Sequence, residues 1–207
     1  MFPSRVSRAA RRLSLAAAIV SVTTLAGCGA MPATRSGFLT EPATLSFNED
    51  GSIGRYRAPA AIDVARSTVG EVRWAAPELI TEEERETLTK SLRQALTTAT
   101  AEARSPGPGR PVLVRAAITR VETVSPTVNT VWALLLLPPF DRGGAAVELE
   151  AVDAETGRSL AAMSHAYFAP LSEFRARFSR LAPAEVAFRR ASQEFVALLG
   201  GQSPPVK

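Results

Sequence analysis

The sequence is poor in the side chains that carry most enzyme and metal chemistry. It has a single cysteine, Cys28, so it can form neither an intramolecular disulfide nor a cysteine-based metal site. Its only histidine, His165, has no second imidazole with which to share a metal, and a catalytic triad would depend on it alone. The motifs His-Glu-x-x-His and Gly-x-Ser-x-Gly are missing, as is a phosphate-binding loop. We therefore expect a protein that is not an enzyme and holds no metal and no cofactor, with His165 in a structural or surface position.

Acidic residues are missing from the first 12 positions, which carry four of the 24 basic residues: Arg5, Arg8, Arg11 and Arg12. No other basic residue precedes position 28, so the rest of the chain has 20 basic residues against 20 acidic ones. A formally neutral chain produces no overall field that attracts DNA, RNA or anionic lipid. The net charge of +4 thus belongs to the N-terminus, and we expect no nucleic-acid partner.

An apolar segment, residues 13–26, follows the basic N-terminus. As a helix it would span about 21 Å, less than a hydrocarbon core of about 30 Å, so it is typical of a cleaved signal peptide. It ends in Leu25-Ala26-Gly27-Cys28, which resembles the lipobox of bacterial lipoproteins. The resemblance implies that residues 1–27 are a lipoprotein signal peptide cleaved between Gly27 and Cys28. It also implies that the Cys28 thiol carries the lipid anchor.

The residues after Cys28 bear on location and on the link to the folded part. In lipoproteins of Gram-negative bacteria an aspartate after the cysteine usually retains the protein in the inner membrane, so Gly29 implies the outer membrane. We expect a protein anchored by lipid on the periplasmic face of that membrane. Residues 28–57, rich in proline, glycine, serine, threonine and alanine, are predicted to form the lipidated N-terminus and a flexible tether.

Local signals predict a single α+β domain over residues 58–200, followed by a disordered tail at 201–207. A capping box at Thr81 and Glu84 predicts a helix that ends before residues 105–109, where proline and glycine stop it. An apolar stripe from Leu181 to Leu198 predicts a C-terminal helix, with a shorter one before it at 171–178. Apolar alternation predicts the strands, at 66–74, 111–122, 145–153 and 158–168, with a hairpin turn at 153–157. This order predicts a mostly antiparallel sheet with helices packed on one face.

Two runs of residues carry a resemblance to a known family. The first is Ser36-Gly37-Phe38-Leu39, shortly after the lipobox, and the second is Gly-Gly-Ala-Ala-Val-Glu-Leu-Glu at 143–150, which continues into Asp-Ala-Glu-Thr-Gly at 153–157. The chain is similar in these runs, and in Asn129, to the bacterial lipoproteins with the domain of unknown function DUF3313. The resemblance spans about residues 35–200 and implies a lipoprotein without an assigned activity, so no catalytic residues are carried over from it.

The apolar run Val131–Leu137 admits two interpretations. It is either a buried strand closed by Pro138-Pro139 or an exposed tip that docks a partner or dips into a membrane. In the second case the contact residues are Val131, Trp132, Leu134, Leu135, Leu136 and Leu137. We accordingly expect a binding or scaffold module that meets an envelope protein partner. The alternatives are a carrier of a lipid or small apolar ligand, and an auxiliary lipoprotein of an envelope transport system.

Charged side chains offer weaker candidates. Glu148 and Glu150 lie two residues apart on one face of a predicted strand, a spacing that suits paired acid–base chemistry, but a solvated sheet face is the simpler interpretation. The C-terminal region is rich in arginine, which suits either anionic headgroups or a solvated helix face. We expect the solvated face for its members, Arg175, Arg177, Arg180, Arg189 and Arg190.

Overall fold

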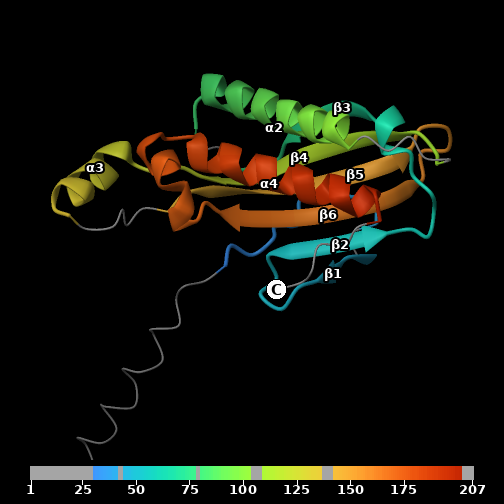
Figure 1. Cartoon of the computed structure of the whole chain (residues 1–207), viewed down its shortest axis with the longest axis horizontal. Coiled ribbons are helices and arrows are strands. Elements are labelled where there is room, and N and C mark those ends of the chain that lie inside the picture. Colours follow the sequence, from blue (N-terminus) through green and yellow to red (C-terminus); the bar gives the residue numbers. More distant parts are fainter. Residues whose placement is uncertain (1–29, 42–43, 78–79, 104–108, 137–141, 202–207) are drawn as a thin grey trace, which may run out of the picture.

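A six-stranded, mostly antiparallel sheet organises the computed structural model, which describes residues 30–41, 44–77, 80–103, 109–136 and 142–201 (Figure 1). Its spatial order is β1-β2-β6-β5-β4-β3, and only β3 and β4 run parallel. The strands are β1 (Ser46–Phe47), β2 (Ile53–Arg57), β3 (Thr68–Trp74), β4 (Val112–Glu122), β5 (Gly144–Asp153) and β6 (Ser159–Phe168). This single α+β domain confirms the predicted fold class.

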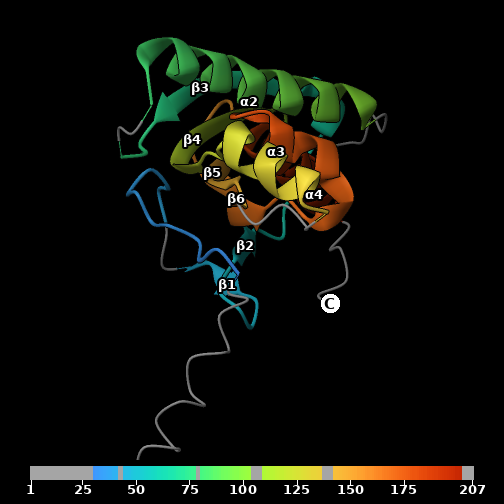
Figure 2. The ribbon, with the colours of Figure 1, turned by 90° about the vertical axis from the view of Figure 1, so that its left-hand side faces the viewer.

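Two long helices, α2 (Glu82–Glu102) and α4 (Ala182–Leu199), cover one face of the sheet (Figures 1 and 2). The predicted capping box opens α2: the Thr81 hydroxyl accepts a hydrogen bond from the Glu84 N–H, and the Glu84 carboxylate accepts one from the Thr81 N–H. Helix α2 crosses over between the parallel strands β3 and β4, whereas α4 ends the domain. Two short 3-10 helices, η2 (Val64–Arg66) and η3 (Leu171–Phe178), precede β3 and α4 respectively.

The main core lies between the sheet and these helices. Alternate residues of β4 and β5 point into it, and each helix contributes one apolar stripe because side chains three and four apart share a helix face. Its fully buried members from the helices are Leu88, Leu92, Leu96, Phe188, Ala191, Phe195 and Leu199. Together with the strand residues they fill the space between the layers.

The hairpin between β5 and β6 forms as predicted. Asp153 is buried, and its carboxylate accepts hydrogen bonds from the N–H groups of Glu155 and Thr156 within the turn. Gly157 completes the turn at a φ of 69°, which glycine adopts without a steric penalty. The Arg110 guanidinium lies 2.8 Å from the same carboxylate and, first among several causes, holds the pKa of Asp153 well below its usual range.

The opposite face of the sheet is covered by the N-terminal segment of the described chain, residues 30–41, which we call the strap (Figure 2). Met31 and Leu39 of the strap are buried, and residues 46–47 and 53–57 pair as β1 and β2. The predicted flexible tether over 28–57 is therefore wrong for the described part of that range. Apolar side chains and backbone pairing fix these residues to the sheet, so the domain begins ahead of residue 58.

A short helix, α3 (Pro126–Leu134), projects from one end of the sheet (Figure 1). The interpretation of Val131–Leu137 as a buried strand is wrong, because residues 131–134 are helical and the whole of 131–136 is at least partly exposed. Ser125 caps the helix and Pro126 occupies its first turn, which are both helix-start signals. Leu137 lies outside the described residues, as do residues 1–27, Cys28 and, apart from Gly201, the predicted tail at 201–207.

Candidate functional site

The end of α3 carries a cluster of exposed apolar side chains, which we call the tip: Val131, Trp132, Leu134, Leu135 and Leu136. Leu134 is 78% exposed and Leu136 is 94% exposed, values close to those of a free side chain. Among the described residues nine large hydrophobic side chains are exposed, and six of them lie between positions 128 and 136. Contiguous exposed apolar patches are typical of surfaces that contact a protein partner or a membrane.

The tip is also free of charge. No acidic or basic residue occurs between positions 123 and 136. Leu136, two residues after the end of α3, has a φ of 57°, in the left-handed region that a leucine rarely adopts. A residue in this conformation turns the chain, so the three consecutive leucines do not continue the helical face. The structure thus places together five of the six contact residues that the sequence suggested.

A buried hydrogen bond fastens α3 to the rest of the domain. Asn129 is fully buried, and its Nδ2 donates to the Arg177 carbonyl of η3 at 2.8 Å. The Arg177 guanidinium is itself buried and donates to the Ala169 carbonyl at 3.1 Å. Because both side chains are bonded inside the domain, the base of α3 is held while its tip is exposed. The expectation that Arg177 lies on a solvated helix face is wrong.

Glu148 and Glu150 hold the strap against the sheet. Both carboxylates are buried, so the expected solvated sheet face is wrong. Glu148 accepts a hydrogen bond from the Ser36 hydroxyl and further bonds of 3.3 Å from the Ser36 N–H. Glu150 accepts bonds of 3.2 Å from both the N–H and the hydroxyl of Thr40. The paired spacing therefore binds backbone and hydroxyl groups of the chain itself.

Arg115 completes the contact at Glu150. Its Nε and Nη2 lie 3.0 and 2.6 Å from one carboxylate oxygen, and Nη2 also donates to the Thr40 hydroxyl at 2.7 Å. The Phe38 ring lies beneath two guanidinium groups, those of Arg115 at 5.5 Å and Arg73 at 5.7 Å, in cation–π geometry. Ser36, Thr40 and Arg115 were not singled out from the sequence. The available signal was two carboxylates in the middle of a strand whose other residues, apart from Asp153 at its end, are small or apolar.

Apolar contacts extend the strap along β5 and β6. Met31 packs against Ala146 and Ala166, and Leu39 packs against Ala162. The alanines leave room for these larger side chains, and Gly37 reaches a φ of 78° between the two attachment points. The run Ser36–Leu39 and the run at 143–150 thus form two sides of one interface.

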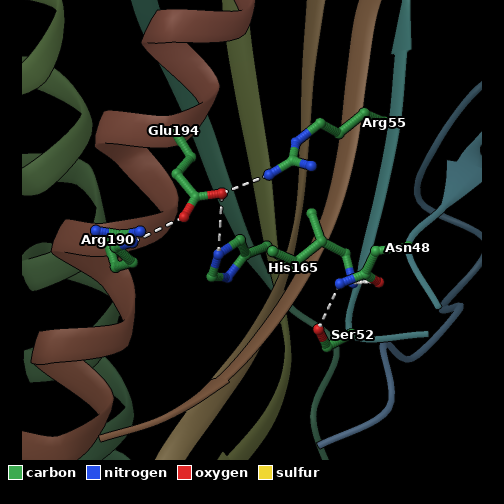
Figure 3. A network of polar contacts seen from close by, with 7 residues as sticks. Asn48, Ser52, Arg55, His165, Arg190 and Glu194 are labelled. Carbon is green, nitrogen blue, oxygen red and sulfur yellow. Dashed lines mark hydrogen bonds and ion pairs between the residues drawn. The ribbon is translucent and has the colours of Figure 1, made fainter. Parts of the chain in front are cut away.

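A second polar cluster joins β2 and β6 to α4 (Figure 3). Glu194 lies 2.7 Å from Arg55 of β2, 2.7 Å from Arg190 of its own helix, and 3.6 Å from Nε2 of His165 on β6. The contact with His165 is too long for a hydrogen bond, so we describe it as electrostatic. Burial raises the pKa of the Glu194 carboxyl, but His165, Arg55 and Arg190 together outweigh it and lower the pKa to about 2.

This cluster has the geometry of a structural clamp. The His165 ring is 1% exposed, so it is a buried residue that substrate cannot reach in this conformation. The other arginines expected on a solvated face are all exposed: Arg175, Arg180, Arg189 and Arg190. Arg180 also lies 2.7 Å from Glu84 of α2. The clamp therefore ties β2, β6 and α4 together.

Surface grooves lie along the helices. One of about 480 Å³ is lined by Val72 and Trp74 together with charged side chains of α2. Another of about 370 Å³ lies between α2 and α4 and is lined mainly by polar side chains. Within the described ranges no group of three or more histidine, cysteine, aspartate or glutamate residues is placed to hold a metal ion. Across that same part of the chain, no helix has both the length and the apolar character to cross a membrane.

Comparisons with known proteins bear on the family and the fold. The family model described as "Protein of unknown function (DUF3313)" matches residues 74–195. No curated protein matches the chain. Among solved structures, a PelC dodecamer from Paraburkholderia phytofirmans is similar at 11% identity and a TM-score of 0.41, over 69% of this chain and 97% of that one. A point variant of that dodecamer is 13% identical with a TM-score of 0.36, over 66% and 95% of the two chains.

Proposed function

The chain belongs to the DUF3313 family, and we propose that it is a lipoprotein anchored through Cys28 on the periplasmic face of a bacterial outer membrane, where its domain works by binding. The observation that carries this proposal is the exposed, uncharged tip of α3, which is held from below by buried polar contacts. The apolar segment 13–26 and the lipobox-like Leu25–Cys28 support the anchor. Gly29 supports the outer membrane.

The strap supports a short connection between anchor and domain. Met31 is buried against β5 and β6, and three peptide bonds join it to Cys28. Three residues span at most about 11 Å when extended. A lipid on Cys28 therefore keeps the sheet close to the membrane surface.

The polar clusters support binding rather than catalysis. Glu148 and Glu150 bind the strap, and Glu194 binds arginines of the sheet and helix. General acid–base catalysis needs a titratable group within reach of a substrate. These buried carboxylates are instead engaged with the protein's own groups, which is a structural use of charge.

The alternative of a lipid or small-ligand carrier needs an apolar cavity. Large side chains such as Leu92, Leu96 and Phe188 fill the space between sheet and helices, where a carrier would hold its cargo. The grooves described above lie on the outer surface and carry charged or polar linings. These observations favour the binding module over the carrier and over an auxiliary role that depends on carrying lipid.

Metabolic labelling tests the anchor. The full chain and its Cys28→Ser variant are expressed in a Gram-negative host supplied with an alkyne-tagged fatty acid. We expect label on the native chain in the outer-membrane fraction, and no label on the variant, which should also keep residues 1–27. An unlabelled native chain that fractionates like the variant would refute the lipoprotein assignment.

Site-directed photo-crosslinking tests the binding role of the tip. A photoreactive residue is placed at position 136 in the tip or, as a control, at position 113, where Leu113 is partly exposed on β4 away from α3. We expect an adduct with a membrane component only from position 136. Equal adduct yields from both positions, or no adduct from either, would show that the tip is not the contact surface.

A further inference from the structure

We propose that the tip inserts into the lipid leaflet that also holds the anchor on Cys28, so that the domain is attached to the membrane at two points. This inference rests on the proposed function and names the occupant of the tip. The competing occupant, an envelope protein, is an outcome of the test below.

The shape of the tip favours lipid over a protein surface. Successive residues of a helix point about 100° apart, so a helix that docks on a protein buries one face and leaves the others polar. Leu134, Leu135 and Leu136 are consecutive, yet all three are exposed and apolar. An apolar surface that faces several directions is satisfied by a medium that surrounds it, as acyl chains do.

The composition of the tip also favours lipid over a protein surface. Protein interfaces place polar groups around an apolar centre, whereas no charged residue occurs between positions 123 and 136. Trp132 is partly exposed at the start of the leucine run. Tryptophan gathers at the boundary between headgroups and acyl chains because its ring is apolar and its N–H is polar. The order from Trp132 to Leu136 therefore matches increasing depth in a leaflet.

Charged groups lie where a headgroup layer would meet the base of the tip. Arg142 is exposed and lies over the Phe168 ring at 5.3 Å, at the sheet end from which α3 projects. On η3, which packs against α3, Phe174 and Arg175 are both exposed. Glu173 is the exposed acidic neighbour on that helix. Glu122, at the end of β4, is exposed as well, so the two arginines are balanced by two glutamates and this end carries no net charge that would repel headgroups. The arginines can contact phosphate groups.

The entry point of the chain lies at the same end. Met31 packs against Ala146 and Ala166, beside the Gly144–Phe168 pair that closes the β5–β6 ladder. The loop after α3 leads directly into Gly144. Met31 and the base of the tip therefore lie at one end of the sheet, and three peptide bonds join Met31 to Cys28, the proposed site of the anchor. A single leaflet can hold the anchor and the tip without a change in the fold.

Tryptophan quenching in vesicles tests the insertion. The full-length lipidated protein is reconstituted into vesicles of phosphatidylethanolamine and phosphatidylglycerol whose acyl chains carry bromine. The Trp74→Phe variant leaves Trp132 as the reporter, and the Trp132→Phe variant leaves Trp74 as the matched control, since the chain has two tryptophans. We expect Trp132 emission to fall by about half and shift to the blue, because interfacial tryptophans lie next to the acyl chains. Trp74 emission should stay unchanged.

Serine variants separate the possible failures. Replacing Leu134, Leu135 and Leu136 by serine should abolish the quenching of Trp132, while Leu113→Ser should preserve it. Unquenched Trp132 in protein that still floats with the vesicles overturns the insertion but leaves the lipoprotein assignment intact. Protein that carries no lipid and does not float shows failure of the proposed function itself. In cells, a position-136 adduct that contains a single envelope protein instead of lipid also overturns the insertion.

Discussion

Glu150 offers a sharp test of how the strap is held. The carboxylate is fully buried and accepts hydrogen bonds from Thr40 and from Arg115, whose side chain is 36% exposed. Glu150→Ala leaves the guanidinium and the Thr40 N–H without their shared acceptor. Removing one member of a buried ion pair costs about 3–5 kcal/mol, and water can reach Arg115, so we expect a loss of about 3 kcal/mol. Glu150→Gln keeps an acceptor without the charge and should lose about half as much.

Urea denaturation of the chain from residue 29 onward measures these free energies of unfolding. Glu155→Ala, in the exposed hairpin turn, is the matched control and should change stability by less than about 0.5 kcal/mol. Trypsin cleavage after Arg35, an exposed strap residue, provides a local readout that should accelerate in Glu150→Ala. If the alanine variant matches the control in both assays, the carboxylate does not hold the strap, and our account of this face is refuted.

Two further predictions follow from buried groups. Folding lowers the pKa of Glu194 from 4.5 to about 2, so its contribution of about 3 kcal/mol is present above about pH 5 and is lost as pH falls towards 2. Thermal unfolding between pH 2 and 7 should show this loss of stability in the native chain, and stability should depend less on pH in Glu194→Gln. Parallel pH profiles for the two proteins would contradict the contribution assigned to Glu194. A Cβ on Gly144 would clash with the Tyr167 carbonyl oxygen, so Gly144→Ala should lower the free energy of unfolding by about 3 kcal/mol. Gly200→Ala is the control: its Cβ would make only ordinary contacts of 3.6 Å and beyond, so stability should not fall. Equal melting temperatures for the two alanine variants would count against the close approach.

Elements with local signals could be predicted from the sequence. The capping box at Thr81, the Asp153–Gly157 turn and the stripe from Leu181 to Leu198 each place their information within a few residues. Helix caps and tight turns are satisfied by neighbours in the chain, so the pattern is sufficient. The fold class followed from the order of these elements.

The sequence did not predict helix α3, because the apolar residues at its end do not pack into the protein core. A helix is recognised by one apolar face, but the run from Val131 shows no such face, since its residues remain exposed. The start of the helix was visible in Ser125 and Pro126, and the buried Asn129 marks its attachment. Periodicity failed here because these side chains are exposed, and the same exposure is the basis for proposing the tip as a contact surface.

The strap could not be predicted from local patterns because its partners lie far away in the chain. Ser36 and Thr40 contact Glu148 and Glu150, which follow more than a hundred residues later. A carboxylate on alternate strand positions is ordinarily solvated, and only the covering segment makes it a buried acceptor. Composition rich in small and polar residues then suggested a tether, although the same residues fit closely against a sheet.

The strap also decides how an anchor on Cys28 would act on the domain. A flexible tether lets a domain turn freely above a membrane, whereas Met31, Ser36 and Thr40 connect the chain after Cys28 directly to β5 and β6. Under the proposed lipidation, the sheet would thus keep a restricted orientation and direct the α3 tip. The family match covers residues 143–150 but begins after Ser36–Leu39, and the structure brings these two runs together in one interface. Under the proposed function, that interface would control how the tip is presented, and the tip itself would make the contact.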